Sequence, residues 1–349
     1  MNLRRASIAA AACLGAAAAA SAAAPSVEIA NQAGPHGTAP REWLQRLAEA
    51  GAGPARLVAA RGKERPRLVE LGEGLGGRPM VKLYGVLTRD GELLLPGPTG
   101  PKRFGRSDRA ALEEYFQRIA GDGPAALTEP RGKFGLTRAE FVDLFTRLQT
   151  PLPEWPQPPT LRRAIDDVSR AARVKIDVAP AAEAALGTTA DAADEVRGLA
   201  SGAGLAAMLR AEGLALQPRR PVGEGVRLVV APAKEADDPW PVGYEPEVAI
   251  GEAAPVLSEF LTVEVEGYTL SEAIDAIRPR LEVNGEPLAI VYDHFALRRD
   301  GVDPAAVEVS FPKRRTFYKR LLGALANQAG LGVELRVDEN GKPLLWLSR

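Results

Sequence analysis

The side chains best suited to catalysis or metal binding are few and scattered along this sequence. The two histidines are His36 and His294, and Asp293 directly precedes the second of them. An Asp-His pair could act as a base or hold a metal, but a zinc site needs a closed set of clustered ligands. The single cysteine, Cys13, lies near the N-terminus and leaves the rest of the chain without a disulfide or thiolate site. We therefore predict no metal site, no cofactor and no catalytic residue, and we place His294 in a loop.

Two short motif matches lack the context that their chemistry requires. Gly72–Gly77 fits the glycine pattern of dinucleotide-binding loops, in which a helix N-terminus must follow to receive the pyrophosphate. Arg78, Pro79 and then an apolar strand pattern follow instead, which indicates a loop between strands. Ser310 and Lys313 fit the S-x-x-K motif of penicillin-interacting enzymes, but its S-D-N and K-T-G companions are missing. Neither match predicts an enzyme.

One cluster of basic residues surrounds two aromatic residues near the C-terminus. Its members are Lys313, Arg314, Arg315, Lys319 and Arg320, with Phe317 and Tyr318 between them. Such a cluster creates a local positive field that favours an acidic protein, an anionic lipid or a glycan. The alternative is a solvated first helical turn whose aromatic residues pack inward. We predict partner binding by these five basic residues.

The elements around these residues begin with an export signal. Arg4 and Arg5 precede an uncharged stretch, Ile8–Ala20, and small residues follow it. This order predicts a signal peptide cleaved at Ala22 or Ala24, and hence a periplasmic or secreted protein; an uncleaved anchor is the alternative. Removing the two arginines takes the formal net charge from −1 to −3, which predicts no nucleic-acid partner. No membrane segment beyond the signal is expected.

The C-terminal half contains a diverged repeat. Thr160–Asp166, with the pattern T-L-x-x-A-I-D, recurs as Thr269–Asp275 at an offset of 109 residues. A second set recurs at an offset of 117 residues, in which Leu205, Ala207, Gly213, Leu214 and Arg219 match Leu322, Ala324, Gly330, Leu331 and Arg336. The order is the same in both copies, and the second copy is 8 residues longer inside. The repeat predicts two related modules, each a small α/β unit.

Composition shifts and turn signals divide the chain into successive segments of an α+β protein. Asp90-Gly91 between apolar runs predicts a hairpin, and Ser107 and Thr137 are expected to cap two helices after it. The expected segments are a signal peptide (1–24), a flexible leader (25–39), an α+β domain of strands, a hairpin and helices (40–150), a proline-rich linker (151–159), a first repeat module (160–231), a second linker (232–258) and a second repeat module (259–349).

Each repeat module is expected to contain a helix, a strand, a second helix and a terminal hairpin. The first helix begins near Leu161 in one module and near Leu270 in the other, where Pro279 should end or kink it. The second helix ends at Gly213 or Gly330, because glycine readily adopts the left-handed conformation after a helix.

This order of elements resembles the short N-terminal domain of secretins and TonB-dependent receptors. The matching pieces are Leu161–Val178 with Leu205–Val230, and Leu270–Tyr292 with Leu322–Leu347. The resemblance implies a periplasmic docking module of mixed α/β fold that is not an enzyme. The sequence departs from the family in two ways: no receptor plug, barrel or secretin ring domain is recognised after the modules, and the first module lacks a strand before its helix. The resemblance implies docking to a partner in general for this chain, but it does not imply the family's particular partners.

Three functions remain open from the sequence. The first is an exported, non-enzymatic docking scaffold that binds a protein partner in the cell envelope. The second is an envelope hydrolase with a carboxylate-only site within residues 40–150, as in many glycan-cleaving enzymes. The third is a cell-wall glycan-binding protein that uses exposed aromatic residues, which a 5% aromatic content makes less attractive. An exposed strand edge on a repeat module would favour docking.

Overall fold

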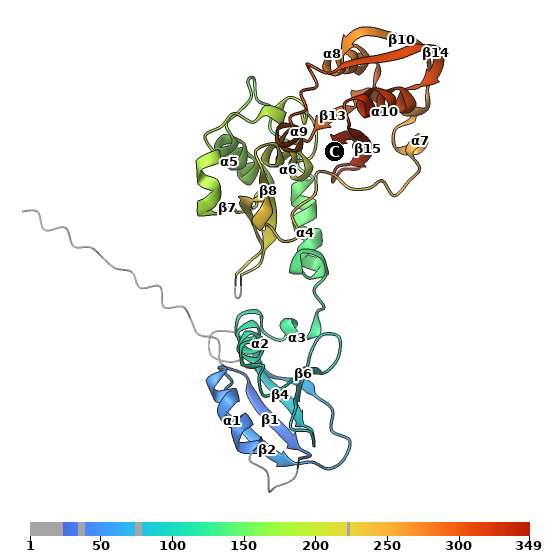
Figure 1. The fold of residues 1–349 in the computed structure, drawn as a ribbon. Helices are drawn as coiled ribbons and strands as arrows, with labels where there is room; N and C mark the ends of the chain where they lie inside the picture. Colours follow the sequence, from blue (N-terminus) through green and yellow to red (C-terminus); the bar gives the residue numbers. More distant parts are fainter. Residues whose placement is uncertain (1–23, 34–38, 74–78, 222–223) are drawn as a thin grey trace, which may run out of the picture. The chain divides into compact units, whose positions relative to one another are not determined.

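The computed structural model describes residues 24–33, 39–73, 79–221 and 224–349, which form a mixed α+β protein. The predicted fold class is therefore confirmed. The chain divides into two compact units, one ending at Pro130 and the other beginning at Arg131 (Figure 1). The signal peptide, His36 and most of the glycine-rich motif lie outside the described residues.

The N-terminal unit is built on one mixed sheet with the strand order β2-β1-β4-β5-β6, and β3 also pairs with β4. The strands are β1 (Ser26–Asn31), β2 (Ala55–Ala59), β3 (Arg67–Glu73), β4 (Pro79–Leu87), β5 (Leu93–Leu95) and β6 (Lys102–Phe104). Helices α1 (Ala39–Glu49), α2 (Arg109–Asp122) and the short α3 (Ala125–Thr128) belong to the same unit. Trp43 of α1 and Phe116 of α2 are buried in one core with Val27 and Ile29 of β1.

The expectation of a flexible leader at residues 25–39 is wrong for Ser26–Asn31. This segment is strand β1, which runs parallel to both β2 and β4 and lies between them. Val27 and Ile29 alternate with the polar residues Ser26 and Glu28 and are almost completely buried. Parallel pairing joins segments that are distant in sequence. The residues around β1 are small and polar and do not indicate a strand locally, so β1 can be recognised only from its pairing with β2 and β4.

Local sequence signals place most turns and helix ends correctly. β4 and β5 form the hairpin expected at Asp90-Gly91, and Gly91 has a φ of 78°. Thr137 opens helix α4 (Arg138–Leu148) through a capping box with Glu140. The N-cap of α2 is Asp108 rather than the expected Ser107, a difference of one residue.

Helix α4 packs with the C-terminal unit, although the sequence placed it in the domain of residues 40–150. Its buried Leu144 and Leu148 share a core with Leu161 and Ile165 of the first module. The boundary between the two compact units therefore falls at residue 130, before the proline-rich segment.

The two repeat modules share one topology, as the repeat predicts. The first contains α5 (Leu161–Ala172), β7 (Ile176–Val178), α6 (Ser201–Ala211), β8 (Leu214–Arg219) and β9 (Arg227–Pro232). The second contains α8 (Leu270–Ile277), β13 (Ala289–Tyr292), α10 (Tyr318–Gln328), β15 (Gly332–Val337) and β16 (Pro343–Ser348). Their sheets have the orders β7-β9-β8 and β13-β16-β15, each with one parallel and one antiparallel pair. Ile165 and Ile274 occupy equivalent, buried positions on the first helices.

The second module carries additions that the first lacks. β10 (Phe260–Thr269) and β14 (Glu308–Phe317) form an antiparallel ribbon, and α10 lies between this ribbon and β15 (Figure 1). A small hairpin of β11 (Glu282–Val283) and β12 (Glu286–Pro287) and a helix α9 (His294–Asp300) complete it. Helix α8 ends before Pro279, as expected.

The two modules pack against each other through the sheet of the second. Val291 and Trp346 on one face of this sheet join the core of the first module, whereas Ile290 and Leu345 on the other face join the core of the second. This division follows the alternation of side chains along a strand. The C-terminal unit therefore has two cores that share one sheet.

The segments expected as linkers are packed parts of the C-terminal unit. Leu152 is buried and its N–H donates to Leu199 O at 2.9 Å, so residues 151–159 begin against the first module. Trp240 is also buried, and residues 232–258 include the short helices α7 (Ile250–Ala253) and η5 (Pro255–Ser258). Proline stiffens these segments, and their apolar side chains fix them to the modules.

Candidate functional site

The five predicted basic residues lie on two adjoining elements of the second module. Lys313, Arg314 and Arg315 belong to strand β14, whereas Lys319 and Arg320 lie in the first turn of α10. The alternative of a first helical turn therefore holds only for the last two residues. All five side chains are exposed, and none forms an ion pair with another described residue. Their positive charge is therefore available to a partner.

Aromatic rings accompany this basic cluster, and one of them is exposed. The guanidinium carbon of Arg314 lies 4.4 Å from the centre of the Phe311 ring, and that of Arg315 lies 4.8 Å from the centre of Phe260. Phe260 is 63% exposed and meets Phe317 edge to face at 6.1 Å. Cation–π contacts hold the arginines over rings without neutralising their charge. The end of the ribbon thus combines uncompensated charge with an exposed aromatic side chain.

The outer edge of β14 is closed to further strands near its start. The side-chain amide of Gln328 accepts from Ser310 N and donates to Ser310 O, both at 3.0 Å. Pro312 follows and has no N–H to offer. These features protect an edge strand from pairing. They also place Ser310 and Lys313 of the S-x-x-K match on an exposed strand, and no described residue activates Ser310 there.

The outer edge of β15 is open over most of its length. β15 pairs with β16, and on its other side the backbone of Tyr244 exchanges two hydrogen bonds of 2.7 and 2.8 Å with that of Val337. Backbone groups alternate between the two edges of a strand, so those of Leu335 and Val333 also point away from β16. No other described residue bonds to the backbone on this side of β15.

Pro246 explains why the chain leaves this edge after Tyr244. In an antiparallel continuation, residue 246 would lie opposite Leu335 and would donate its N–H to the Leu335 carbonyl. Proline has no N–H, so the pairing stops there. The outer edge of β15 is therefore paired at its last residue, Val337, and unpaired at Leu335 and Val333.

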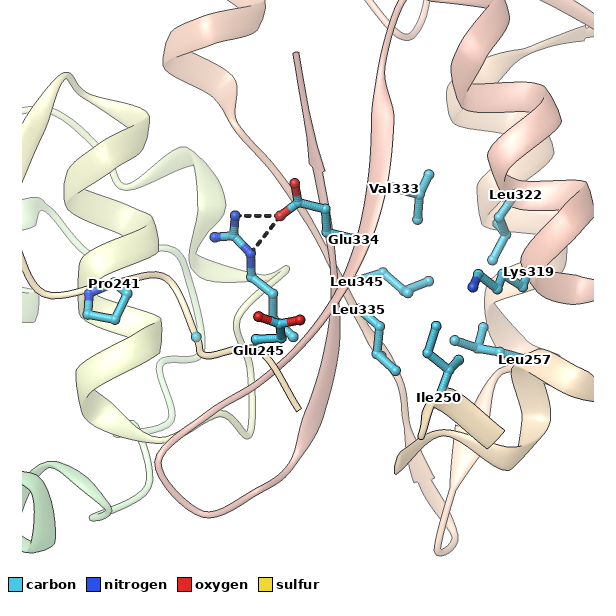
Figure 2. A pocket seen from close by; sticks show the side chains of 12 residues that line it. Pro241, Glu245, Ile250, Leu257, Lys319, Leu322, Val333, Glu334, Leu335 and Leu345 are labelled. Carbon is cyan, nitrogen blue, oxygen red and sulfur yellow. Dashed lines mark hydrogen bonds and ion pairs between the residues drawn. The ribbon is translucent and has the colours of Figure 1, made fainter. Parts of the chain in front are cut away.

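A groove of about 630 Å³ lies beside the unpaired edge (Figure 2). Apolar side chains from β15, β16, α10, α7 and η5 gather along it: Val333, Leu335, Leu345, Leu322, Ile250 and Leu257. Lys319 lies at the same side as these residues, whereas Glu245 and Glu334 lie across the strand. Glu334 is paired with Arg336 at 2.6 Å. The groove thus offers an apolar floor, one unpaired cation and free backbone groups.

The turn between β15 and β16 fastens the two modules together. Asp338 accepts from Ala200 N at 2.7 Å, and Glu339 accepts from Ala203 N at 3.0 Å and from Trp240 Nε1 at 2.6 Å. Carboxylates are favoured at this place because it is the N-terminus of α6. Glu339 is only 3% exposed, and burial raises its pKa to about 7, although its hydrogen bonds act in the opposite direction.

Asp293 and His294 also contribute to the contact between the modules. His294 begins helix α9, which corrects the expected loop, and its Nε2 lies 2.9 Å from Glu195 Oε1 of the first module. Burial is the largest single influence on the pKa of His294 and lowers it, but the bond with Glu195 and the charges of Glu195 and Asp191 together outweigh burial and leave the pKa above its ordinary value. Asp293 is 1% exposed and pairs with Arg210 at 2.6 Å. Within the described residues, no group of three or more His, Cys, Asp or Glu is arranged to hold a metal.

A smaller cavity of about 340 Å³ in the N-terminal unit collects three carboxylates. Glu42 lies 3.8 Å from Arg106, Glu49 lies 3.8 Å from an arginine of α2, and Asp108 accepts from Gly105 N at 2.8 Å. Each carboxylate is thus already held by an arginine or a backbone N–H. The arrangement does not present two free carboxylates to each other across the cavity.

Of the groove residues, only Lys319 is predicted from the sequence as a binding residue. Tyr244 and Pro246 are the residues that determine where pairing to this edge stops. Their sequence predicts an open edge only once β15 is known to be an edge strand. None of the described helices combines the length and the hydropathy that a membrane span requires. Among family models, curated proteins and solved structures, none matches this chain.

Proposed function

We propose that this protein is an exported, non-enzymatic docking scaffold of the cell envelope, and that its second module binds an extended segment of a protein partner. The observation that carries the proposal is the open edge of β15 beside an apolar groove. Export rests on the signal pattern before residue 25, and the periplasm or the exterior is the corresponding compartment.

The shared topology of the modules supports their resemblance to the short N-terminal domain of secretins and TonB-dependent receptors. Both modules have the order helix, strand, helix and hairpin on which the resemblance rests. The second module also has a strand, β10, before its first helix, whereas no strand is described directly before α5. The second module is therefore the better candidate for docking.

The groove chemistry indicates the kind of segment that fits. An added strand would bond to the backbone of Leu335 and Val333 and would place alternate side chains over the apolar floor. Lys319 and the basic cluster beyond it favour an acidic residue in or beside that strand. We infer a partner segment that is extended, apolar at alternate positions and acidic.

Val333→Pro is expected to weaken binding of such a segment about five- to tenfold, because it removes one outward N–H and its hydrogen bond. The N–H of Val333 does not pair with β16, so the sheet should persist. A library of displayed decapeptides selected on the mature protein supplies the probe. Affinities of the selected peptides for the two proteins are then compared.

Val333→Ala is the matched control, since it shortens the side chain but keeps the N–H. The proposal requires selected peptides that alternate apolar residues, contain Asp or Glu and lose more affinity with proline than with alanine. Equal losses would show that the backbone edge is not used. Failure to select any peptide would contradict docking at this groove.

Charge reversal in the basic cluster should also weaken binding. Arg314→Glu with Arg315→Glu is expected to lower the affinity of acidic peptides about tenfold at low salt, and less at high salt, because Coulomb attraction is screened. Isothermal titration with the selected peptides measures both values. Arg138→Glu with Arg219→Glu changes the net charge equally at exposed positions of the same unit. A similar loss in that control would mean that total charge, and not the cluster, determines the affinity.

A further inference from the structure

The N-terminal sheet has one face that its helices do not cover. Val27 and Leu83 point into the core beneath α1 and α2, so the alternating residues Glu28, Ala30 and Tyr84 lie on the opposite face. That second face contains a cavity of about 650 Å³. The segment between β2 and β3 forms part of its wall.

Four cations at alternate positions line the cavity, three from that segment and one from the start of β3: Arg61, Lys63, Arg65 and Arg67. The side chains of Arg61, Lys63 and Arg65 are exposed, and none forms an ion pair with another described residue. Arg67 lies 4.4 Å from the centre of the Tyr84 ring. The alternation was visible in the sequence as R-G-K-E-R-P-R, but only the position of the sheet shows that these side chains gather at one cavity.

The two carboxylates that line the cavity are already occupied. Glu28 accepts from Arg56 and pairs with Lys82 at 2.9 Å, and these contacts lower its pKa, the bond from Lys82 most strongly. Glu64 accepts from the backbone N–H groups of Arg61 and Gly62, and the bond from Arg61 N is the main reason for its lowered pKa. Glu28 is paired with two cations outside the segment, and the charge of Arg61 is only the smallest cause of the lowered pKa of Glu64. The lining contains four cations and two carboxylates. The cavity therefore carries an uncompensated positive charge.

We propose that this cavity binds a phosphate-bearing ligand. Arginine presents several N–H donors in a planar fork that matches phosphate oxygens, and lysine adds a point charge. A concave site concentrates the field of such charges and attracts a multivalent anion. A soluble polyphosphate compound and a phospholipid headgroup share this chemistry, and both fit three unpaired cations around one cavity.

Isothermal titration of the full mature chain with sodium tripolyphosphate tests the proposal. Tricarballylate serves as a carboxylate anion for comparison, and phosphatidylglycerol vesicles represent the headgroup source. We expect tripolyphosphate or the vesicles to bind in preference to tricarballylate, and the affinity to fall as salt is added. Binding of the vesicles alone would assign the ligand to a membrane, and binding of tripolyphosphate would assign it to a soluble compound.

The variant Arg61→Gln, Lys63→Gln, Arg65→Gln should lower the affinity at least about tenfold, because three charge-assisted contacts are lost. The matched control Arg41→Gln, Arg89→Gln, Arg118→Gln removes the same charge from positions that do not line the cavity. Circular dichroism confirms that both variants are folded. The proposal is overturned if neither phosphate probe binds, if tricarballylate binds as well, or if the control loses as much affinity.

Discussion

Gly202→Ala is expected to destabilise the C-terminal unit by about 2–3 kcal/mol, although alanine normally favours a helix over glycine. Gly202 lies in the first turn of α6, where a Cβ would be 2.7 Å from both Trp240 Nε1 and the Glu339 carboxyl carbon. The indole and the carboxylate are both buried and hydrogen-bonded to each other, so neither has space to move. The added methyl must therefore push the turn between β15 and β16 away from the helix.

Gly323→Ala in α10 is the matched control for this prediction. A Cβ at Gly323 meets no atom within 4 Å, so alanine should stabilise the unit by about 0.5–1 kcal/mol through helix propensity alone. Urea denaturation followed by tryptophan fluorescence measures both changes, and a Trp43→Phe background restricts the signal to the C-terminal unit. If both substitutions stabilise the protein, the two modules do not pack at α6 as described.

Features that depend on neighbouring residues are predictable from this sequence. Thr137 and Thr269 open their helices through capping boxes, and each box involves a glutamate three residues further on. The repeat was equally accessible, because equal topology preserves the spacing of Ile165 and Ile274 relative to their helices. In these cases the residues that interact, or that define the pattern, lie within a few positions of one another in the sequence, so a local pattern is sufficient to predict them.

Features that depend on distant pairing were missed. β1 is recognisable only through its parallel partners β2 and β4. Lys313–Arg315 extend β14 because they pair with β10, where Arg315 lies opposite Thr262. A polar, basic run after an apolar strand pattern more often indicates the end of a strand. Here an exposed two-stranded ribbon continues, because only one of its faces needs apolar residues.

The candidate site could be predicted only in part, because most of its residues are distant from one another in sequence. The charge of Lys319 is visible in the sequence, but the groove beside it joins residues from five elements. The roles of Glu339 and Asp293 depend on contact between the two modules, which no local pattern encodes. Charged groups and module topology can therefore be predicted from the sequence, whereas the surfaces on which these groups lie depend on three-dimensional packing.

The pH dependence of stability provides the most direct test of the contact between the modules. Glu339 has a pKa of about 7 in the folded protein and an ordinary value of 4.5, so the folded state binds the proton more tightly than the unfolded state. The contribution of this proton is complete below about pH 4.5 and is lost as the pH rises through about 7. One pKa unit corresponds to about 1.4 kcal/mol, so the loss should reach about 3 kcal/mol.

Glu339→Gln isolates this contribution, because glutamine has a similar shape and does not titrate. Its oxygen can still accept from Ala203 N or from Trp240 Nε1, whereas Asp338 remains in place on Ala200 N. Urea denaturation from pH 4 to pH 8 measures the free energy of unfolding of both proteins. As the pH rises, the wild-type protein should lose stability relative to the glutamine variant. A difference that is constant across this range would show that Glu339 titrates as an exposed carboxyl does, and that the turn between β15 and β16 is not buried against α6.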